Sequence, residues 1–316
     1  MRFLNTGGSS VGEKQRIQKL TNVLRCIMAF LCIDVGGTNT LIGVGNGDFE
    51  VIEKISSSKF LNNIEGCLEN ILEESKIEKI EDVAVAAAGP MDRDKGVFYP
   101  PNIDLEEVDL RTPLSNFGNL MIINDCTSAV LGEKYYGEHD VSDLVYVTIS
   151  SGIGAGVVID DELLEGWNGN FGEIGHMKIT DEPVKCGCGY EGHWEAFCSG
   201  NNLPEMAERL TGLPFENARE VFDKASVQEH EAQEAIQKMR KYNARGFANI
   251  VALFNPEKIV VGGAVALNHP EEVVDPLEKQ VADRAVNKTP EIELCSLGER
   301  SVLHGLRAVC NGKYDA

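Results

Sequence analysis

The stretch Asp34-Val35-Gly36-Gly37-Thr38-Asn39 follows a short apolar run that begins at Ala29. Two glycines after a strand allow a tight turn, so backbone N–H groups and the Thr38 hydroxyl can approach a phosphate while Asp34 holds water or Mg²⁺. A tight hairpin in which glycine supplies a positive φ is the alternative. On the first interpretation, a nucleotide contacts Asp34, Gly36, Gly37, Thr38 and Asn39.

Strands and helices alternate on the C-terminal side of this turn, as in α/β proteins. Apolar runs bounded by turn residues predict strands over residues 29–34, 41–45, 51–55, 83–88, 120–123, 144–149, 153–159 and 259–261. Apolar residues at helical spacing predict helices over residues 64–75, 127–136, 203–210, 218–224, 232–254 and 302–309.

The strand-turn-strand unit over residues 29–45 occurs again over residues 144–159. Its second turn, Ser150-Ser151-Gly152-Ile153-Gly154-Ala155-Gly156, offers the same phosphate-binding chemistry through Ser151, Gly152 and Gly154. Two like domains that face each other would hold a nucleotide between them. Gly262-Gly263 follows a further strand and would admit an adenine ring against bare backbone, with a simple turn as the alternative.

The chain has 316 residues, of which 43% are hydrophobic and 25% charged, enough for two packed cores. We expect a flexible extension over residues 1–27, a small α/β domain over 28–124 and a large α/β domain over 125–300. The C-terminal helix, 301–316, is expected to join the small domain.

A net charge of −21 repels nucleic-acid phosphates and anionic lipid, so neither nucleic acid nor a membrane is an expected partner. The same field repels ATP, so a nucleotide site must overcome it locally with backbone N–H groups or Mg²⁺. Nine scattered cysteines without a recognisable secretory signal predict a reducing, cytoplasmic location.

Asn124 and Asp125 lie where a predicted strand ends and a helix begins. Polar residues at the carboxyl ends of strands are where open α/β sheets bind ligands. Asp125 would then be a general base that takes a proton from a hydroxyl group as it attacks a γ-phosphate. A carboxylate that only caps the helix is the alternative, and the sequence leaves both open.

The most specific motif combines Gly172-Glu173-Ile174-Gly175-His176 with Cys186-Gly187-Cys188-Gly189 and His193-Trp194-Glu195. Two thiolates and two imidazoles suit tetrahedral Zn²⁺, and a closed four-ligand site is structural. The loop 176–193 would therefore bind zinc, unless it holds two free cysteines near unrelated histidines. The expected ligands are His176, Cys186, Cys188 and His193, whereas His139, His230, His269 and His304 are expected to be surface or core histidines without partners.

Together these residues resemble the ROK sugar kinases, a family within the actin-like, hexokinase-like ATPase fold. The resemblance runs from about Met28 to the end of the chain, through both turns and the Gly-Glu-x-Gly-His, Cys-x-Cys-Gly and Glu motif. It implies an α/β, ribonuclease-H-like fold of two domains with the active-site cleft between them, in a homo-oligomer, either a dimer or a tetramer. The family usually has a third cysteine where His193 stands.

The same resemblance implies an ATP-dependent hexose kinase that transfers the γ-phosphoryl group of Mg²⁺-ATP to the 6-hydroxyl of a hexose, glucose first. ATP, Mg²⁺ and a structural Zn²⁺ are the implied cofactors. Asp125 is the implied catalytic base, and the implied sugar contacts are Asn102, Asn124, Asp125, Glu173, His176 and Glu195. An N-acetylhexosamine or fructose kinase is the alternative within enzymes, because carboxylate hydrogen bonds do not distinguish hexoses. The alternative outside the enzymes is a protein that binds sugar as a sensor and has no catalytic activity.

Overall fold

The computed structural model of the chain describes residues 29–75, 77, 79–93, 95–99 and 107–314. The expected extension over residues 1–27 and the expected sugar contact Asn102 lie outside these residues.

The strands are β1 (Ala29–Val35), β2 (Asn39–Asn46), β3 (Asp48–Ser56), β4 (Asp82–Ala87), β5 (Met91–Asp92), β6 (Val97–Phe98), β7 (Val108–Asp109), β8 (Asn119–Asn124), β9 (Leu144–Ile149), β10 (Ile153–Ile159), β11 (Glu162–Leu163), β12 (Lys258–Gly262) and β13 (Glu291–Leu294).

The α-helices are α2 (Ser57–Asn62), α3 (Ile64–Ser75), α4 (Arg111–Leu114), α5 (Asp125–Tyr136), α6 (Glu195–Cys198), α7 (Leu203–Thr211), α8 (Ala218–Ser226), α9 (His230–Phe254), α10 (Ala264–Asn268), α11 (Pro270–Val273), α12 (Leu277–Ala282) and α13 (Ser301–Cys310). Two short 3₁₀ turns cover Ile174–His176 and Gly298–Arg300. Every predicted strand and helix corresponds to one of these elements.

Two five-stranded sheets share one strand plan. The first has the order β3-β2-β1-β4-β8 and the second the order β11-β10-β9-β12-β13. In each sheet the first strand pairs antiparallel with the next strand in sequence and parallel with a later one. The predicted repetition of a strand-turn-strand unit is therefore confirmed, and it extends to the whole sheet.

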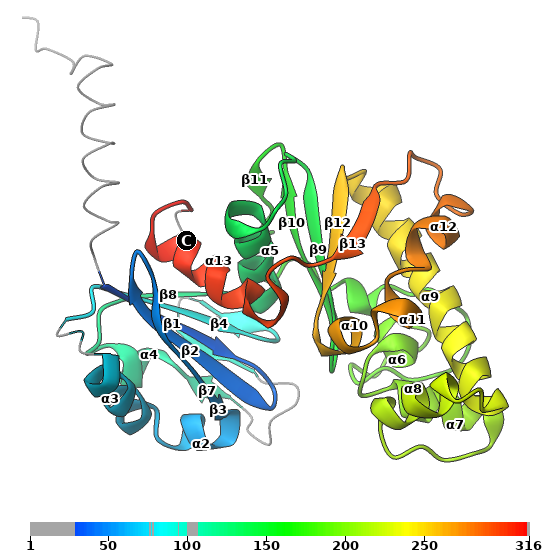
Figure 1. Cartoon of the computed structure of the whole chain (residues 1–316), viewed down its shortest axis with the longest axis horizontal. Coiled ribbons are helices and arrows are strands. Elements are labelled where there is room, and N and C mark those ends of the chain that lie inside the picture. Colours follow the sequence, from blue (N-terminus) through cyan, green and yellow to red (C-terminus); the bar gives the residue numbers. More distant parts are fainter. Residues whose placement is uncertain (1–28, 76, 78, 94, 100–106, 315–316) are drawn as a thin grey trace, which may run out of the picture.

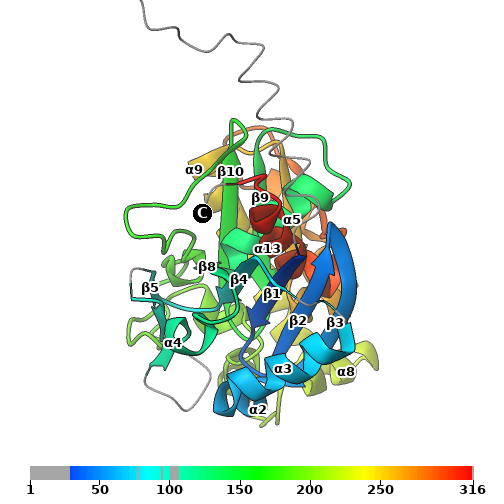
Figure 2. The same cartoon turned by 90° about the vertical axis from the view of Figure 1, so that its left-hand side faces the viewer.

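Helices cover both faces of each sheet, which explains why the strands read as continuous apolar runs. In β1, Leu31 and Ile33 pack toward α3, whereas Phe30 and Cys32 pack toward α13. Figure 2 shows α2 and α3 on one side of this sheet and α13 on the other. In the second sheet, α9 covers one face and α5 the other.

Helices α5 and α13 lie side by side between the two sheets (Figure 1). Their backbones come into close contact through two glycines. A Cβ atom added to Gly132 would lie 2.0 Å from the carbonyl oxygen of Ser301, and one added to Gly305 would lie 1.7 Å from that of Ser128. Only glycine permits this approach at either position.

Among the described residues, no helix combines the length and the apolar composition that crossing a bilayer would require.

Candidate active site

The first glycine turn joins β1 to β2, with Val35 paired to Thr40. The Gly36 N–H donates to the Asn39 carbonyl at 3.1 Å, and a Cβ on Gly36 would lie 2.8 Å from that oxygen. Neither Gly36 nor Gly37 has a positive φ, so a left-handed backbone is not what requires glycine here. The Ser57 hydroxyl at the start of α2 donates to the Gly36 carbonyl at 2.6 Å and so supports the turn. Residues 37–39 are exposed.

The second turn, between β9 and β10, is closed by a hydrogen bond from the Ser150 N–H to the Gly152 carbonyl at 2.9 Å. Ser151 is exposed at its tip. Gly154 lies inside β10 instead, where a Cβ atom would lie 2.9 Å from the Cys126 sulfur. This glycine therefore allows the start of α5 to pack against β10. A nucleotide contact by Ser151, Gly152 or Gly154 stays a prediction.

Gly262-Gly263 lies beside this second turn, because Gly262 pairs with Thr148 at the end of β9. Gly263 has a φ of 87°, which L side chains rarely adopt. A Cβ there would also lie 2.6 Å from the Ile149 carbonyl oxygen. Close packing on β9 accounts for this glycine, and the adenine contact stays a prediction.

Asp34 and Asp125 come together because β1, β4 and β8 are parallel, with Asp34 level with Ala86 and Asn124 level with Ala87. Asn124 is the N-cap of α5, and its side-chain oxygen accepts the Cys126 and Thr127 N–H groups at 2.9 and 3.2 Å. The cap is therefore Asn124 and not Asp125. Asp125, the first helical residue, also accepts the Cys126 N–H, at 2.8 Å.

Burial and crowding raise the pKa values of three carboxyl groups at this site. Burial, and then the charge of Asp125, raise the pKa of Asp34 to about 8. Burial also raises the pKa of Asp125, against hydrogen bonds from Cys126. The pKa of Glu173 is raised by burial and by Asp125 and Glu195, with His176 opposing. Crowded oxygen ligands of this kind suit a divalent cation, and a carboxylate with a raised pKa suits a general base.

The four predicted zinc ligands lie together, with their ligand atoms all within 4.8 Å of one another. The Cys186 sulfur is 3.5 Å from His176 Nδ1, and the Cys188 sulfur is 3.2 Å from His193 Nδ1. Tetrahedral Zn²⁺, with ligand bonds of about 2.0 to 2.3 Å, requires ligand atoms at such separations. Burial raises the pKa of the Cys186 thiol to about 11, so a bound cation is needed to ionise it near neutrality. The set fits a Cys₂His₂ metal site.

Glu173 and Glu195 flank this cluster. The Glu173 side chain is 44% exposed, although protein atoms surround much of its carboxylate, which lies 3.7 Å from His176 Nε2. Glu195 is the first residue of α6, and one of its oxygens accepts the Ile153 N–H of the second turn at 2.9 Å. The structure thus brings Asp125, Glu173, His176 and Glu195 into one acidic region.

Sequence reasoning missed a polar network around Glu133, a fully buried carboxylate on α5. Burial alone would raise the pKa of Glu133, but hydrogen bonds from His139, Ser301, Ser296 and Leu297 lower it to about 2. The His139 Nε2 atom is 2.8 Å from this carboxylate, so the expectation that His139 has no partner was wrong. Apart from His139, the partners are 163 to 168 residues away in the sequence, so no local motif signals them.

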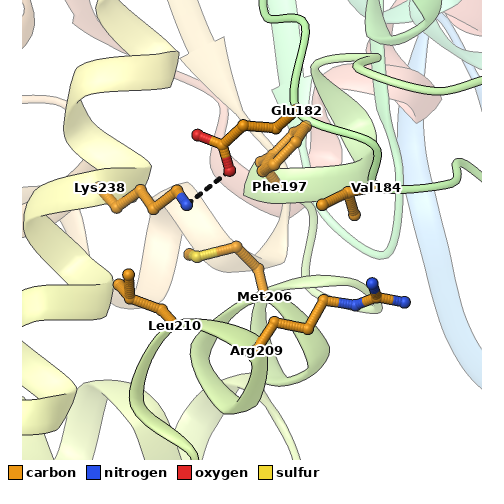
Figure 3. A pocket seen from close by; sticks show the side chains of 7 residues that line it. All are labelled: Glu182, Val184, Phe197, Met206, Arg209, Leu210 and Lys238. Carbon is orange, nitrogen blue, oxygen red and sulfur yellow. Dashed lines mark hydrogen bonds and ion pairs between the residues drawn. The ribbon is translucent and has the colours of Figure 1, made fainter.

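A hollow of about 160 Å³ lies between the loop 176–193, through its residues Glu182 and Val184, and helices α6, α7 and α9 (Figure 3). Its charged groups are paired: the Lys238 ammonium contacts Glu182 at 2.7 Å, and Arg209 contacts Glu205 at 2.6 Å. Its lining residues are Glu182, Val184, Phe197, Met206, Arg209, Leu210 and Lys238, and none was predicted as a site residue.

Comparison with known proteins identifies close relatives. The chain is 35% identical to a glucokinase of Pyrobaculum calidifontis over 230 residues, which cover 72% of this chain and 77% of the relative. It is 30% identical to a glucokinase of Aeropyrum pernix over 305 residues, 88% of this chain and 95% of the relative. A ROK hexokinase from Thermus thermophilus superimposes with a TM-score of 0.77 at 26% identity, over 88% of this chain and 96% of that structure. The expected α/β fold of two actin-like domains is thereby confirmed.

The model of the ROK family matches residues 30–311. This range includes both five-stranded sheets, both glycine turns and the Cys/His cluster. The chain therefore belongs to the ROK family.

Proposed function

We propose that this chain is an ATP-dependent hexose kinase that transfers the γ-phosphoryl group of Mg²⁺-ATP to the 6-hydroxyl of glucose. The observation that carries the proposal is the proximity of the Asp34 and Asp125 carboxyl groups at the carboxyl ends of the parallel strands β1 and β8, with Asp125 at the start of α5 and its pKa raised by burial. Two relatives that are at least 30% identical are glucokinases, which supports glucose as the acceptor.

In the proposed reaction, Asp125 accepts the proton of the sugar hydroxyl while that oxygen bonds to the γ-phosphorus and ADP leaves. Asn102, Asn124, Glu173, His176 and Glu195 would hold the other sugar hydroxyls. Both glycine turns would hold the phosphates, with contacts from Asp34, Gly36, Gly37, Thr38, Asn39, Ser151, Gly152 and Gly154, and Gly262 and Gly263 would border the adenine. Mg²⁺, when bound, neutralises phosphate charge. Domain closure would exclude water, so that sugar is phosphorylated instead.

The role of Asp125 is tested with Asp125→Asn. Without the carboxylate that accepts the proton, we expect turnover to fall by about 10²- to 10⁴-fold while glucose affinity changes little. The measurement is ADP release from Mg²⁺-ATP with glucose, mannose, fructose, N-acetylglucosamine and N-acetylmannosamine, beside glucose binding by calorimetry. Wild-type turnover in the Asn variant would disprove the assignment. Binding of a sugar without ADP release by the wild-type protein would favour a sensor.

We further propose that the Cys/His cluster holds a structural Zn²⁺, which the donor set and its spacing support.

We propose domain boundaries at 28–124 and 125–300, with the segment 301–316 joined to the first domain. The packing of Leu303 and Leu306 on Phe30 and Ala84 supports that assignment. That the protein is a cytoplasmic homo-oligomer stays an expectation. Light scattering on the protein as it elutes from a size-exclusion column would measure the mass of the oligomer.

A further inference from the structure

The second glycine turn is held on both sides by the segment that contains α6. On one side, the Ile153 N–H donates to the Glu195 carboxylate at 2.9 Å. On the other, the Gly200 N–H donates to the Ser150 carbonyl at 2.7 Å, and the Asn201 N–H to the Ser151 carbonyl at 3.3 Å. The conformation of the turn therefore depends on where α6 and its first residue lie.

Glu195 fits against this turn only because residue 152 is glycine. A Cβ atom on Gly152 would lie 2.7 Å from Glu195 Oε2, the same oxygen that accepts the Ile153 N–H. The other oxygen, Oε1, is 3.8 Å from the sulfur of Cys186, one of the four residues of the Cys/His cluster. One carboxylate thus contacts the glycine turn and the cluster at the same time.

The cluster and Glu195 are also connected through a rigid backbone. His193 pairs with Lys178 across the loop, and the next residue, Trp194, donates its N–H to the Met177 carbonyl at 3.0 Å. The Trp194 side chain is fully buried and donates its indole N–H to Asn243 on α9 at 2.9 Å. Glu195 follows directly, so a displacement of His193 or Cys186 is transmitted to it without a flexible linker.

We propose that Glu195 is a positioning residue that couples the Cys/His cluster to the second glycine turn, so that an occupied cluster fixes the turn for binding a nucleotide phosphate. The nucleotide half of this inference rests on the proposed kinase function. It assigns the cluster an effect on the phosphate-binding turn, beyond the structural role proposed above. Glu173, which flanks the cluster but has no hydrogen bond to the turn among those the structure describes, provides a matched control.

The coupling is tested by hydrogen exchange of the segment 150–156 in the full-length protein, loaded with zinc or stripped with a chelator. Loss of a hydrogen bond to a charged acceptor is expected to speed exchange at the Ile153 amide by about tenfold or more. We expect this in Glu195→Ala and in the stripped wild-type protein. Glu195→Gln, which keeps an acceptor oxygen, and Glu173→Ala are expected to match the loaded wild type.

Gly152→Ala approaches the same contact from the turn, because its new methyl group would displace the Glu195 carboxylate. It is expected to speed exchange as Glu195→Ala does, and it keeps the test usable if Glu195→Ala does not fold. Exchange in β1 and β4 serves as the internal reference for global unfolding. Unchanged exchange in both variants, or in the stripped protein, would overturn the coupling.

The consequence for the ligand is measured as MgADP binding by calorimetry in the absence of sugar, with Mg²⁺ restored after stripping. Glu195→Ala and the stripped protein are expected to bind MgADP about tenfold more weakly, which is about 1.4 kcal/mol, and added Zn²⁺ to restore the stripped protein. Glu173→Ala and Glu195→Gln are expected to bind it as the wild type does. If exchange responds but the wild type binds no MgADP, the coupling stands and the kinase function fails. If MgADP binds equally well in all forms, the effect on the nucleotide is disproved.

Discussion

Asp34 is the penultimate residue of the buried strand β1, and the ionisation of its carboxyl group is opposed by burial and by Asp125. Its pKa in the folded protein, about 8, is above the ordinary value of 3.8. Between these values the native state binds more protons than the unfolded state, so stability falls as the pH rises through this window. The negative charge of Asp34, which would bind a cation, therefore lowers the free energy of unfolding while no cation is bound.

Asp34→Asn removes that charge with little change in shape. We expect it to raise the free energy of unfolding by about 2 kcal/mol near pH 9 and by almost nothing near pH 4. The expected gain is below what the full pKa shift implies, because Asp34 is only half-buried and solvent screens it. Urea unfolding without Mg²⁺ measures it, with Asp283→Asn at an exposed position as the control. An equal effect at both pH values would contradict this account.

The spacing of site residues in the sequence predicted that the Cys/His cluster would come together, but it did not predict the cap of α5 or the partners of Glu133. The four residues from His176 to His193 come together as expected, because a short loop limits how far its ligands can separate. The sequence could not show which residue caps α5, because Asn and Asp are both good N-caps. The structure shows that Asn124 has the extended backbone of an N-cap and that Asp125 is the first helical residue. Three partners of Glu133 come from residues 296, 297 and 301, so no local pattern reveals them.

The sequence predicted that α5 is a helix, but it did not predict which elements pack around that helix. Eight of its residues, from Cys126 to Glu133, are buried, so over this stretch the helix has no solvent-exposed face whose polar residues would indicate its orientation. The second sheet, the first sheet and α13 all pack on it. The buried strands were predicted well, because the run of apolar residues is continuous. The edge strands β11 and β13 and the two-residue strands β5, β6 and β7 were missed, since two to four residues give no readable period.

Glu133 on α5 joins that helix to the segment before α13. Glu133→Gln leaves the shape but removes the charge that accepts these hydrogen bonds, and we expect a loss of about 3 kcal/mol in unfolding free energy at pH 7. The pKa of Glu133 is lowered on folding, from 4.5 to about 2, so its contribution is lost as the pH falls through that window. The difference between the variant and the wild type should therefore shrink toward pH 3. Thermal unfolding across this range measures it, and a difference that stays constant would disprove the charge account.

The loop 176–193 has little regular structure beyond two isolated bridges, Lys178 with His193 and Lys185 with Glu191. Backbone hydrogen bonds of turns also close the loop, such as those from the Cys186 N–H to the Tyr190 carbonyl and from the Gly192 N–H to the Val184 carbonyl. Because four possible ligands meet on this loop, we expect a bound metal to stabilise its fold. Elemental analysis of the purified protein is expected to find about one zinc per chain. Cys188→Ser should lose most of the zinc, whereas Cys67→Ser, at a cysteine remote from the cluster, should keep it. Folded, active protein without zinc would disprove the proposed site.

For the whole molecule, a net charge of −21 means that the folded state brings like charges together. Salt screens that repulsion, so we expect the melting temperature to rise by about 2 to 5 °C between about 0.02 M and about 0.5 M KCl. Sucrose, which adds no ions, is the control for general solute effects. A melting temperature that falls with KCl would show that local ion pairs outweigh the net repulsion.

The contact of α5 with α13 through Gly132 and Gly305 has a consequence for how this chain can vary. Backbone lies against backbone there, so even alanine would separate the helices. Asp125 begins one of those helices and would shift with it. A library of variants that preserves every proposed contact residue can therefore still lose activity through a single added methyl group, at a position that makes none of the proposed contacts.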